Sequence, residues 1–216
     1  MERTKNRLSA KGLVTSKKMI SLAFILGMAG LALLLIFTNT LTVIVALIGW
    51  FFYVVIYTML AKRNTTLGTA FGSVSGAIPP VVGYCAANNV FNGGAIILFI
   101  ILCFWQMPHS YAIAIFRLKD YTAAKIPVLP VKLGIARTKV SMLVFTILYC
   151  IAVIMPSVFG YTGWIYFIVA LTTGLYWLYI GIKGFSKKIN DQSWARKMFF
   201  ISIINIMLIS FAMAFD

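Results

Sequence analysis

Seven long apolar runs dominate the chain, and short polar segments separate them. Each run is close to the ~20 residues that an α-helix needs to cross ~30 Å of hydrocarbon, and none contains Asp, Glu, Lys or Arg. Membrane-spanning strands would show alternating apolar and polar residues, and these runs do not. The pattern predicts one domain over residues 1–216, an all-α polytopic transmembrane helix bundle of about seven spans. The expected spans are 19–37, 41–61, 67–87, 95–116, 140–158, 164–182 and 198–215.

Composition supports a membrane protein and excludes a water-soluble globule. Hydrophobic residues make up 62% of the chain and charged residues 11%, whereas soluble domains carry about 25% charged residues. The formal net charge of +15 is also typical of nucleic-acid binding. Here, however, the basic residues form short clusters between apolar runs, as they do in the loops of membrane proteins. We therefore expect a lipid bilayer around the chain and no nucleic-acid partner.

Lysine and arginine residues fall on alternate connections between the runs. They occupy the segment before the first run and the loops after the second, fourth and sixth runs, while the other connections and the C-terminus hold none. The positive-inside rule then predicts a multi-pass protein with a cytoplasmic N-terminus and a C-terminus outside. The longer polar loops also lie on the cytoplasmic side, so we expect the functional residues there.

The fourth span, 95–116, carries a stripe of residues spaced by three or four that runs out past its end. The stripe consists of Gln106, Ser110, Ile113, Arg117 and Asp120. On a helix these positions share one face, and His109 lies beside them. A polar stripe inside a membrane protein faces either a cavity or a packed neighbour that satisfies its polar groups, and the sequence leaves both open. His109, the one histidine, fits a structural hydrogen bond, acid–base chemistry or a haem contact.

Asp120 is one of four acidic residues, and it stands among the basic residues Arg117, Lys119 and Lys125. One interpretation is a plain surface salt bridge. The other is a Mg²⁺ ligand, because Mg²⁺ takes one or two carboxylates and completes its shell with substrate phosphate and water. Nearby Arg and Lys side chains would then neutralise the phosphate oxygens.

The third span, 67–87, is unusual for a membrane helix. Gly68, Gly72 and Gly76 recur every four residues, and Pro79 and Pro80 interrupt its middle. The glycines permit close approach by a neighbouring helix. The two prolines remove backbone donors and predict a kink. The span therefore either lines a cavity or packs closely for structural reasons.

Several motifs together resemble the haem O synthase family of farnesyltransferases, which belongs to the UbiA-type intramembrane prenyltransferases. The resemblance covers essentially the whole chain. The motifs are Met1-x-Arg3-Thr4-x-x-Arg7, Lys62-Arg63, Ser75-Gly76-Ala77-x-Pro79-Pro80 with Gly83-Tyr84, Trp105-Gln106-Met107-Pro108-His109, Asp120-Tyr121-x-x-Ala124-x-Ile126-Pro127-x-Leu129-Pro130-Val131, and Trp194-Ala195-Arg196-Lys197.

The resemblance implies a bundle around a central cavity, corresponding to the last seven of nine helices in that family. It implies farnesyl transfer from farnesyl diphosphate to a vinyl group of haem b (protohaem IX), with Mg²⁺ bound beside the diphosphate. The product would be haem O, which serves terminal oxidases. The location would be the bacterial inner membrane, and further partners would be haem-copper oxidase or haem A synthase machinery.

Site residues carried over from the family are also what the resemblance implies. Asp120 would be a metal ligand, and His109 would lie near the haem or the prenyl path, with Arg117 and Lys119 beside the reacting groups. The expected diphosphate-binding residues are Arg3, Arg7, Lys62, Arg63, Arg117 and Lys119.

One feature of the family is missing from this sequence. The family carries an Asn-x-x-x-Asp-x-x-x-Asp stretch and two helices before the segment that corresponds to Met1. We therefore expect an N-terminally incomplete chain with little or no transferase activity by itself. The alternative functions are a membrane transporter or channel, a haem-binding assembly protein without catalysis, and a prenyltransferase for a quinone precursor.

Overall fold

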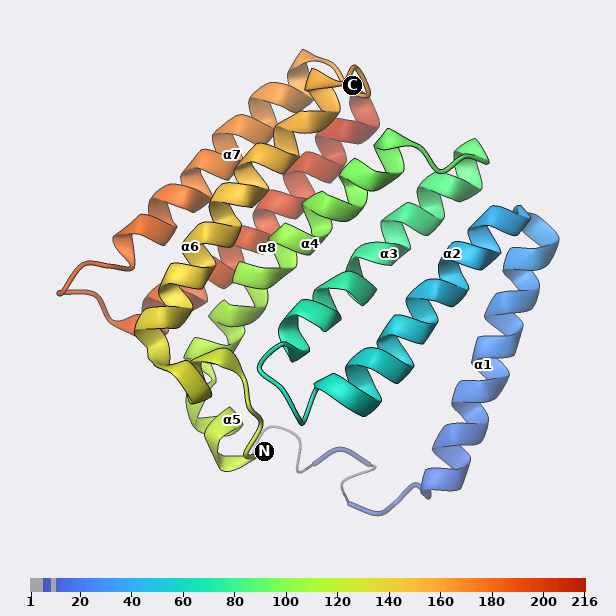
Figure 1. The fold of residues 1–216 in the computed structure, drawn as a ribbon, viewed down its shortest axis with the longest axis horizontal. Coiled ribbons are helices and arrows are strands. Elements are labelled where there is room, and N and C mark those ends of the chain that lie inside the picture. Colours follow the sequence, from blue (N-terminus) through green and yellow to red (C-terminus); the bar gives the residue numbers. More distant parts are fainter. Residues whose placement is uncertain (1–5, 9–10) are drawn as a thin grey trace.

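The computed structural model describes residues 6–8 and 11–216, which form a bundle of helices (Figure 1). Seven helical segments of the described residues are long and apolar enough to cross a membrane, so the predicted all-α architecture with seven spans is confirmed. The elements are α1 (Ser16–Phe37), α2 (Thr40–Phe51) continuing as the π-helical η2 (Phe52–Ala61), α3 (Gly68–Asn88), α4 (Gly93–Phe116), α5 (Leu118–Ala123), α6 (Leu129–Val158), α7 (Trp164–Lys183) and α8 (Asp191–Phe215).

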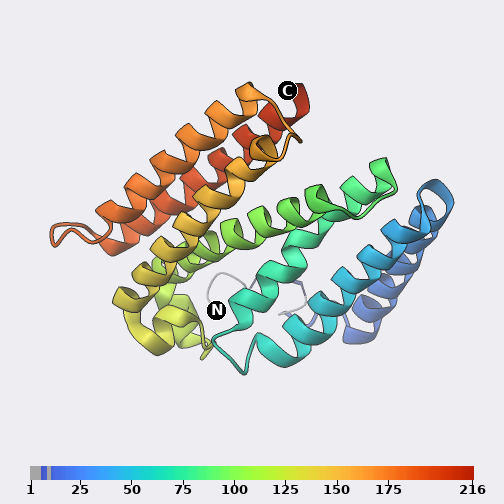
Figure 2. The same cartoon turned by 45° about the horizontal axis from the view of Figure 1, so that its top comes forward.

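Helix α4 is the centre of the arrangement and packs against α3, α6 and α8. Figures 1 and 2 show α6, α7 and α8 grouped on one side of α4, with α3, α2 and α1 following one another on the other side. Helix α1 packs against α2 and has no buried residue. Its apolar side chains are therefore suited to contact with lipid.

Two apolar clusters hold the bundle together. The larger lies between α4, α6, α7 and α8 and includes the fully buried side chains of Tyr149, Tyr166 and Trp177. The smaller joins α2, α3 and α4 through residues such as Val45 and Val81. The site described below lies on the α3–α4 side of the bundle, so both clusters fix its walls.

Two buried indole N–H groups, one on α7 and one on α8, find partners within the bundle, where water is absent. The indole N–H of Trp177 donates to the carbonyl of Met198 at 3.1 Å. The indole N–H of Trp194 donates to the carbonyl of Ile180 at 2.8 Å. These bonds cross the same helix pair in opposite directions and fix its register.

Two short connections at the end of the bundle away from α5 are fixed by asparagines. Asn39 caps the start of α2 and also donates its amide to the carbonyl of Cys85 on α3, at 2.9 Å. Asn92 caps the start of α4 and accepts a hydrogen bond from the hydroxyl of Tyr84 at 2.9 Å. Capping asparagines satisfy backbone donors that a helix leaves free. The three helices α2, α3 and α4 are thereby joined at this end.

Two local features differ from the sequence expectation, the start of α6 and the loop after α4, whereas α3 keeps its expected range. Helix α6 begins at Leu129, well before the expected span at 140–158, but Gly134 interrupts it with a φ of +80°, a value that glycine adopts readily. Helix α3 contains Pro79 and Pro80 and covers the range expected for the third span. The loop after α4 contains the additional short helix α5.

Candidate functional site

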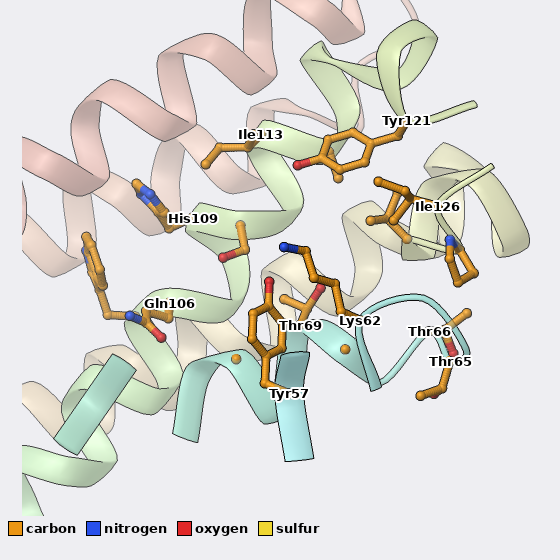
Figure 3. Close-up of a pocket in the computed structure, with 17 residues that line it drawn as sticks. Tyr57, Lys62, Thr65, Thr66, Thr69, Gln106, His109, Ile113, Tyr121 and Ile126 are labelled. Carbon is orange, nitrogen blue, oxygen red and sulfur yellow. The ribbon is translucent and has the colours of Figure 1, made fainter. Parts of the chain in front are cut away.

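A cavity of about 450 Å³ lies where η2 and α4 end and α3 begins. Its walls come from η2, the loop after it, the first turns of α3, the last turns of α4, Tyr121 of α5 and the segment 126–128 (Figure 3). The polar side chains in these walls include Tyr57, Lys62, Gln106, His109, Ser110 and Tyr121. The cavity therefore combines apolar walls with a few polar groups, as small-molecule sites usually do.

The glycine stripe of α3 makes room for side chains from neighbouring elements. A Cβ at Gly72 would lie 3.1 Å from the ring of Tyr57, and a Cβ at Gly76 would overlap the side-chain amide of Gln106. Both Tyr57 and Gln106 line the cavity. Gly72 and Gly76 are thus close-approach positions, as predicted. The side chains that approach them, Tyr57 and Gln106, form part of the polar wall of the cavity.

His109 is held by residues of α4 and α8. Its Nδ1 lies 2.7 Å from the hydroxyl oxygen of Ser202. The imidazole stacks on Trp105, with ring centroids 4.7 Å apart, and lies 4.8 Å from the ring of Phe199. The indole N–H of Trp105 in turn donates to the carbonyl of Ser202 at 2.8 Å. The histidine is therefore a fixed part of the wall rather than a freely rotating side chain.

Lys62 supplies the permanent charge of the cavity, since no other described lining residue is a Lys, Arg, Asp or Glu. Its Nζ lies 5.7 Å from the ring centroid of Tyr57. Figure 3 shows the polar ends of Lys62, Tyr57 and Tyr121 directed into the same space. An ammonium with two phenol hydroxyls nearby is suited to an anion such as a phosphate.

Arg117 and Asp120 pair with each other at the corner between α4 and α5. Arg117 Nη1 lies 3.9 Å from Asp120 Oδ2, and the two side chains are 44% and 23% exposed. Neither lines the cavity, although the next residue, Tyr121, does. A partly exposed pair at this distance contributes little to stability, on the order of 0–1 kcal/mol.

The other predicted cations are exposed and do not line the cavity. These are Arg7, Arg63 and Lys119. Arg3 lies outside the residues that the structure describes. Of the described residues predicted from the sequence, Lys62 and His109 line the cavity. The other described ones do not line it: Arg7, Arg63, Arg117, Lys119 and Asp120. The roles of the predicted cations as diphosphate partners stay predictions.

Three residues that the sequence interpretation gave no role are part of the site or its support. Tyr57 and Tyr121 line the cavity, and both stand close in sequence to basic residues that were singled out. Ser202 lies 93 residues from His109 along the chain and within an apolar run. Nothing in the sequence pairs those two positions, so only the packing of α8 on α4 reveals their contact.

Carboxylates that could hold a metal ion are few. The described residues contain three, and no three His, Cys, Asp or Glu side chains of the described part gather as a metal site. Asp191 pairs with Lys139 at 2.5 Å, and Asp216 accepts from the backbone at the start of α7. Asp120 directly precedes Tyr121, which lines the cavity, and its role as a Mg²⁺ ligand stays a prediction.

Comparisons with known proteins agree with this architecture. A solved structure described in work on digeranylgeranylglyceryl phosphate synthase in membranes matches with a TM-score of 0.79 at 18% identity, covering 98% of this chain and 75% of that one. That likeness shows the fold.

Several proteins similar in sequence share a name. A protoheme IX farnesyltransferase of Pectobacterium carotovorum subsp. carotovorum is 48% identical over all 216 residues, which is 73% of its own length. Proteins of the same name from Sodalis glossinidius and Yersinia pseudotuberculosis are 47% identical over the same span. The resemblance to farnesyltransferases of this kind is therefore confirmed. The UbiA prenyltransferase family matches residues 1–204, and the chain belongs to that family.

Proposed function

We propose that this chain acts in the transfer of a farnesyl group from farnesyl diphosphate to a vinyl group of haem b, which gives haem O. The observation that carries the proposal is the 48% identity to a protoheme IX farnesyltransferase over all 216 residues. The cavity supports it, because its apolar walls suit a prenyl chain and Lys62 suits a diphosphate. The two substrates are a lipid-like anion and a flat, largely apolar porphyrin, and both partition naturally to a site within a membrane protein.

The diphosphate would lie at the end of the cavity where Lys62 stands. Breaking the allylic C–O bond sends the electron pair to the leaving diphosphate, so negative charge builds there during the reaction. Cations that meet this charge stabilise the transition state more than the ground state. Lys62 would contact the diphosphate directly. We propose that the rim and loop cations complete the binding site: Arg3, Arg7, Arg63, Arg117 and Lys119.

Asp120 would hold Mg²⁺ together with the diphosphate oxygens. The bound ion would supply positive charge to the leaving group. Residues of this chain would orient the groups around the ion. Arg117, 3.9 Å from Asp120, would orient that carboxylate, and the hydroxyl of the next residue, Tyr121, points into the cavity.

The deeper walls would receive the porphyrin and the prenyl chain. Trp105 and His109 form an aromatic surface there, and Ile113 lies one turn closer to the rim. Adding an allylic cation to a vinyl group would form one C–C bond and leave a cation at the carbon next to the ring. One water molecule would then add at that carbon as a hydroxyl group and release a proton. The walls must therefore exclude stray water until the new bond has formed.

The orientation in the membrane follows from where the charges lie. The loop after η2, helix α5 and the α7–α8 loop carry basic residues and lie at one end of the bundle (Figure 1). We propose that this end faces the cytoplasm of a bacterial cell, with the C-terminus outside. The cavity then opens where a water-derived diphosphate arrives.

Reconstituted protein tests the function. The full chain in lipid nanodiscs would be given haem b, Mg²⁺ and farnesyl diphosphate, and haem O would be measured by mass spectrometry. Because we expect a low rate, the readout is accumulated product after long incubation rather than initial rate. Binding of haem b, followed by absorbance, and binding of farnesyl thiodiphosphate, an analogue with a slow leaving group, would be measured in parallel.

The expected result is haem O that forms only when all three components are present. Haem binding without any farnesyl thiodiphosphate binding would instead indicate an assembly protein. Passage of either ligand across sealed vesicles would indicate a transporter, and farnesylation of a quinone precursor in place of haem would change the acceptor. Each of these results contradicts the proposal.

A further inference from the structure

Ser202 on α8 is completely buried and contacts the site through both its side chain and its backbone. Its hydroxyl donates to the carbonyl of Phe199 at 2.6 Å and lies 2.7 Å from Nδ1 of His109. Its carbonyl accepts the indole N–H of Trp105. A small residue in an apolar span is thus the point at which α8 contacts the polar wall of the cavity.

The number of hydrogens available at this contact determines the tautomer of His109. A serine hydroxyl has one hydrogen, and Ser202 gives it to Phe199. Nδ1 of His109 must therefore be the donor in the contact with Ser202, which makes the neutral imidazole the Nδ1–H tautomer. Nε2 then carries a free lone pair.

Nε2 is open to a ligand. His109 lines the cavity, and among the described residues Nε2 makes no hydrogen bond. It is also not sealed from the surroundings, because the one fully buried side-chain nitrogen or oxygen without a partner in the described part is Nδ2 of Asn205. A lone pair at the wall of an apolar cavity can bind a metal ion or accept a proton.

We propose that Ser202 is a positioning residue that holds His109 in the Nδ1–H tautomer and presents Nε2 to the iron of the haem acceptor. The proposal rests on the proposed function, since it takes haem b as the substrate. Histidines that ligate metals generally donate their other ring N–H to a protein acceptor, which sets both the tautomer and the ring orientation. Ser202 is that acceptor here.

Iron coordination fits the surroundings of His109 better than proton uptake. A base that accepts a proton becomes a cation, yet the cavity already holds Lys62, and none of its described lining residues is a carboxylate. Coordination leaves the imidazole neutral. The rings of Trp105 and Phe199 lie at 25° and 37° to the imidazole plane, so the plane is held whether or not a ligand is present.

The test compares four variants of the full chain in nanodiscs loaded with haem b. Ser202→Ala removes the acceptor for Nδ1 but keeps the backbone carbonyl that Trp105 uses. Ser202→Thr keeps a hydroxyl, and His109→Ala removes the ligand. Ser210→Ala is the matched control, because Ser210 lies on the same helix, is exposed and bonds only its own helix among the described residues.

Absorbance, electron paramagnetic resonance and the iron–histidine stretch of ferrous haem report the axial ligand. We expect a histidine-ligated spectrum in the wild type and in Ser210→Ala, and its loss in His109→Ala. Ser202→Ala should weaken haem binding by about 10- to 100-fold and alter the iron–histidine stretch, while Ser202→Thr restores both. Binding of farnesyl thiodiphosphate should be unchanged in Ser210→Ala and in both Ser202 variants.

Two results would overturn the positioning role. An unchanged spectrum in His109→Ala would exclude the contact between His109 and iron. An unchanged haem affinity and iron–histidine stretch in Ser202→Ala would show that Ser202 does not position His109. Failure of the wild type to bind haem b at all, with farnesyl thiodiphosphate still bound, would instead contradict the proposed acceptor. The two failures are therefore distinguishable.

Discussion

Gly76 on α3 faces the side-chain amide of Gln106 on α4 so closely that a Cβ at position 76 would overlap it. Gln106 lines the cavity. Because Gly76 has no side chain, the amide of Gln106 can occupy this position in the cavity wall. The two helices also belong to the smaller apolar cluster, which limits how far they can separate. A stripe of small residues thereby shapes a binding wall as well as a helix contact.

We expect Gly76→Ala to displace Gln106 and to lower the free energy of unfolding. Overpacking costs about 1–3 kcal/mol, and alanine recovers about 1 kcal/mol of helix propensity over glycine, so the net loss should be about 0–2 kcal/mol. Unfolding in mixed micelles measures this. The matched control is Gly83→Ala on the same helix, where a new Cβ meets nothing within 4 Å. Equal losses in the two variants would contradict the explanation.

Lys62 should govern affinity for the diphosphate. Removing a charged hydrogen-bond partner costs about 1.5–3 kcal/mol, so Lys62→Ala should weaken binding of farnesyl thiodiphosphate by about 10-fold or more. Binding of haem b should change little. Lys188→Ala is the control, because Lys188 is exposed on the α7–α8 loop and does not line the cavity. Equal weakening in the two variants would indicate a general effect of net charge instead of a contact.

Asp120 should determine whether Mg²⁺ assists diphosphate binding. In the wild type we expect farnesyl thiodiphosphate to bind at least about 10-fold more tightly with Mg²⁺ than with EDTA, and in Asp120→Asn we expect most of that difference to vanish. Calorimetric titration in both buffers measures it. The comparison is Asp191→Asn, which removes the partner of Lys139 and should lower stability while leaving the Mg²⁺ dependence intact. A full Mg²⁺ response in Asp120→Asn would exclude this residue as a ligand.

The sequence predicts the fold well because lipid imposes a simple rule. A run of about 20 apolar residues that must satisfy its own backbone becomes a helix, and seven such helices are present among the described residues. The same helical spacing predicts one face of α4 correctly, since Gln106, Ser110 and Ile113 all line the cavity. Hydropathy and helical spacing along the chain are therefore sufficient to predict both the seven helices and the cavity-facing residues of α4.

The prediction of the site becomes weaker where the helix stops. The predicted stripe includes Arg117 and Asp120 only if the helix is continuous. Helix α4 instead ends at Phe116, and Arg117 has a non-helical backbone. The 3.6-residue period no longer applies beyond that point, and Tyr121 lines the cavity instead. Ser202 could not be found for a different reason, because its role depends on how distant helices pack.

A buried hydrogen bond between α6 and α8 should contribute to stability in the lipid environment. Tyr149 donates its hydroxyl to Oδ1 of Asn205 at 2.8 Å, and both residues are fully buried. Tyr149→Phe keeps the ring and its edge contact with Trp177, so only the hydrogen bond is lost. We expect a loss of about 0.6 kcal/mol, the average for such bonds in a membrane bundle, and at most about 1.7 kcal/mol. Tyr176→Phe, on the exposed face of α7, should change the free energy of unfolding by much less.

We expect the end of the bundle that carries Lys188 to face the cytoplasm. The three native cysteines would first be replaced by alanine, and single cysteines would then be placed at Lys188, on the α7–α8 loop, and at Val90, on the connection between α3 and α4. Both positions are exposed and lie at opposite ends of the bundle. In intact bacterial cells a membrane-impermeant thiol reagent should label position 90 and spare position 188 until the cells are broken.

That result follows from charge alone, because basic loops are retained on the cytoplasmic side. It also matters for the chemistry, since Lys62 and the rim of the cavity lie at the same end as Lys188. Farnesyl diphosphate would then reach Lys62 from the compartment in which soluble phosphates are made, without its charge crossing the bilayer. Labelling of position 188 in intact cells would place the cavity mouth on the outer side and would leave the diphosphate with no direct route to Lys62.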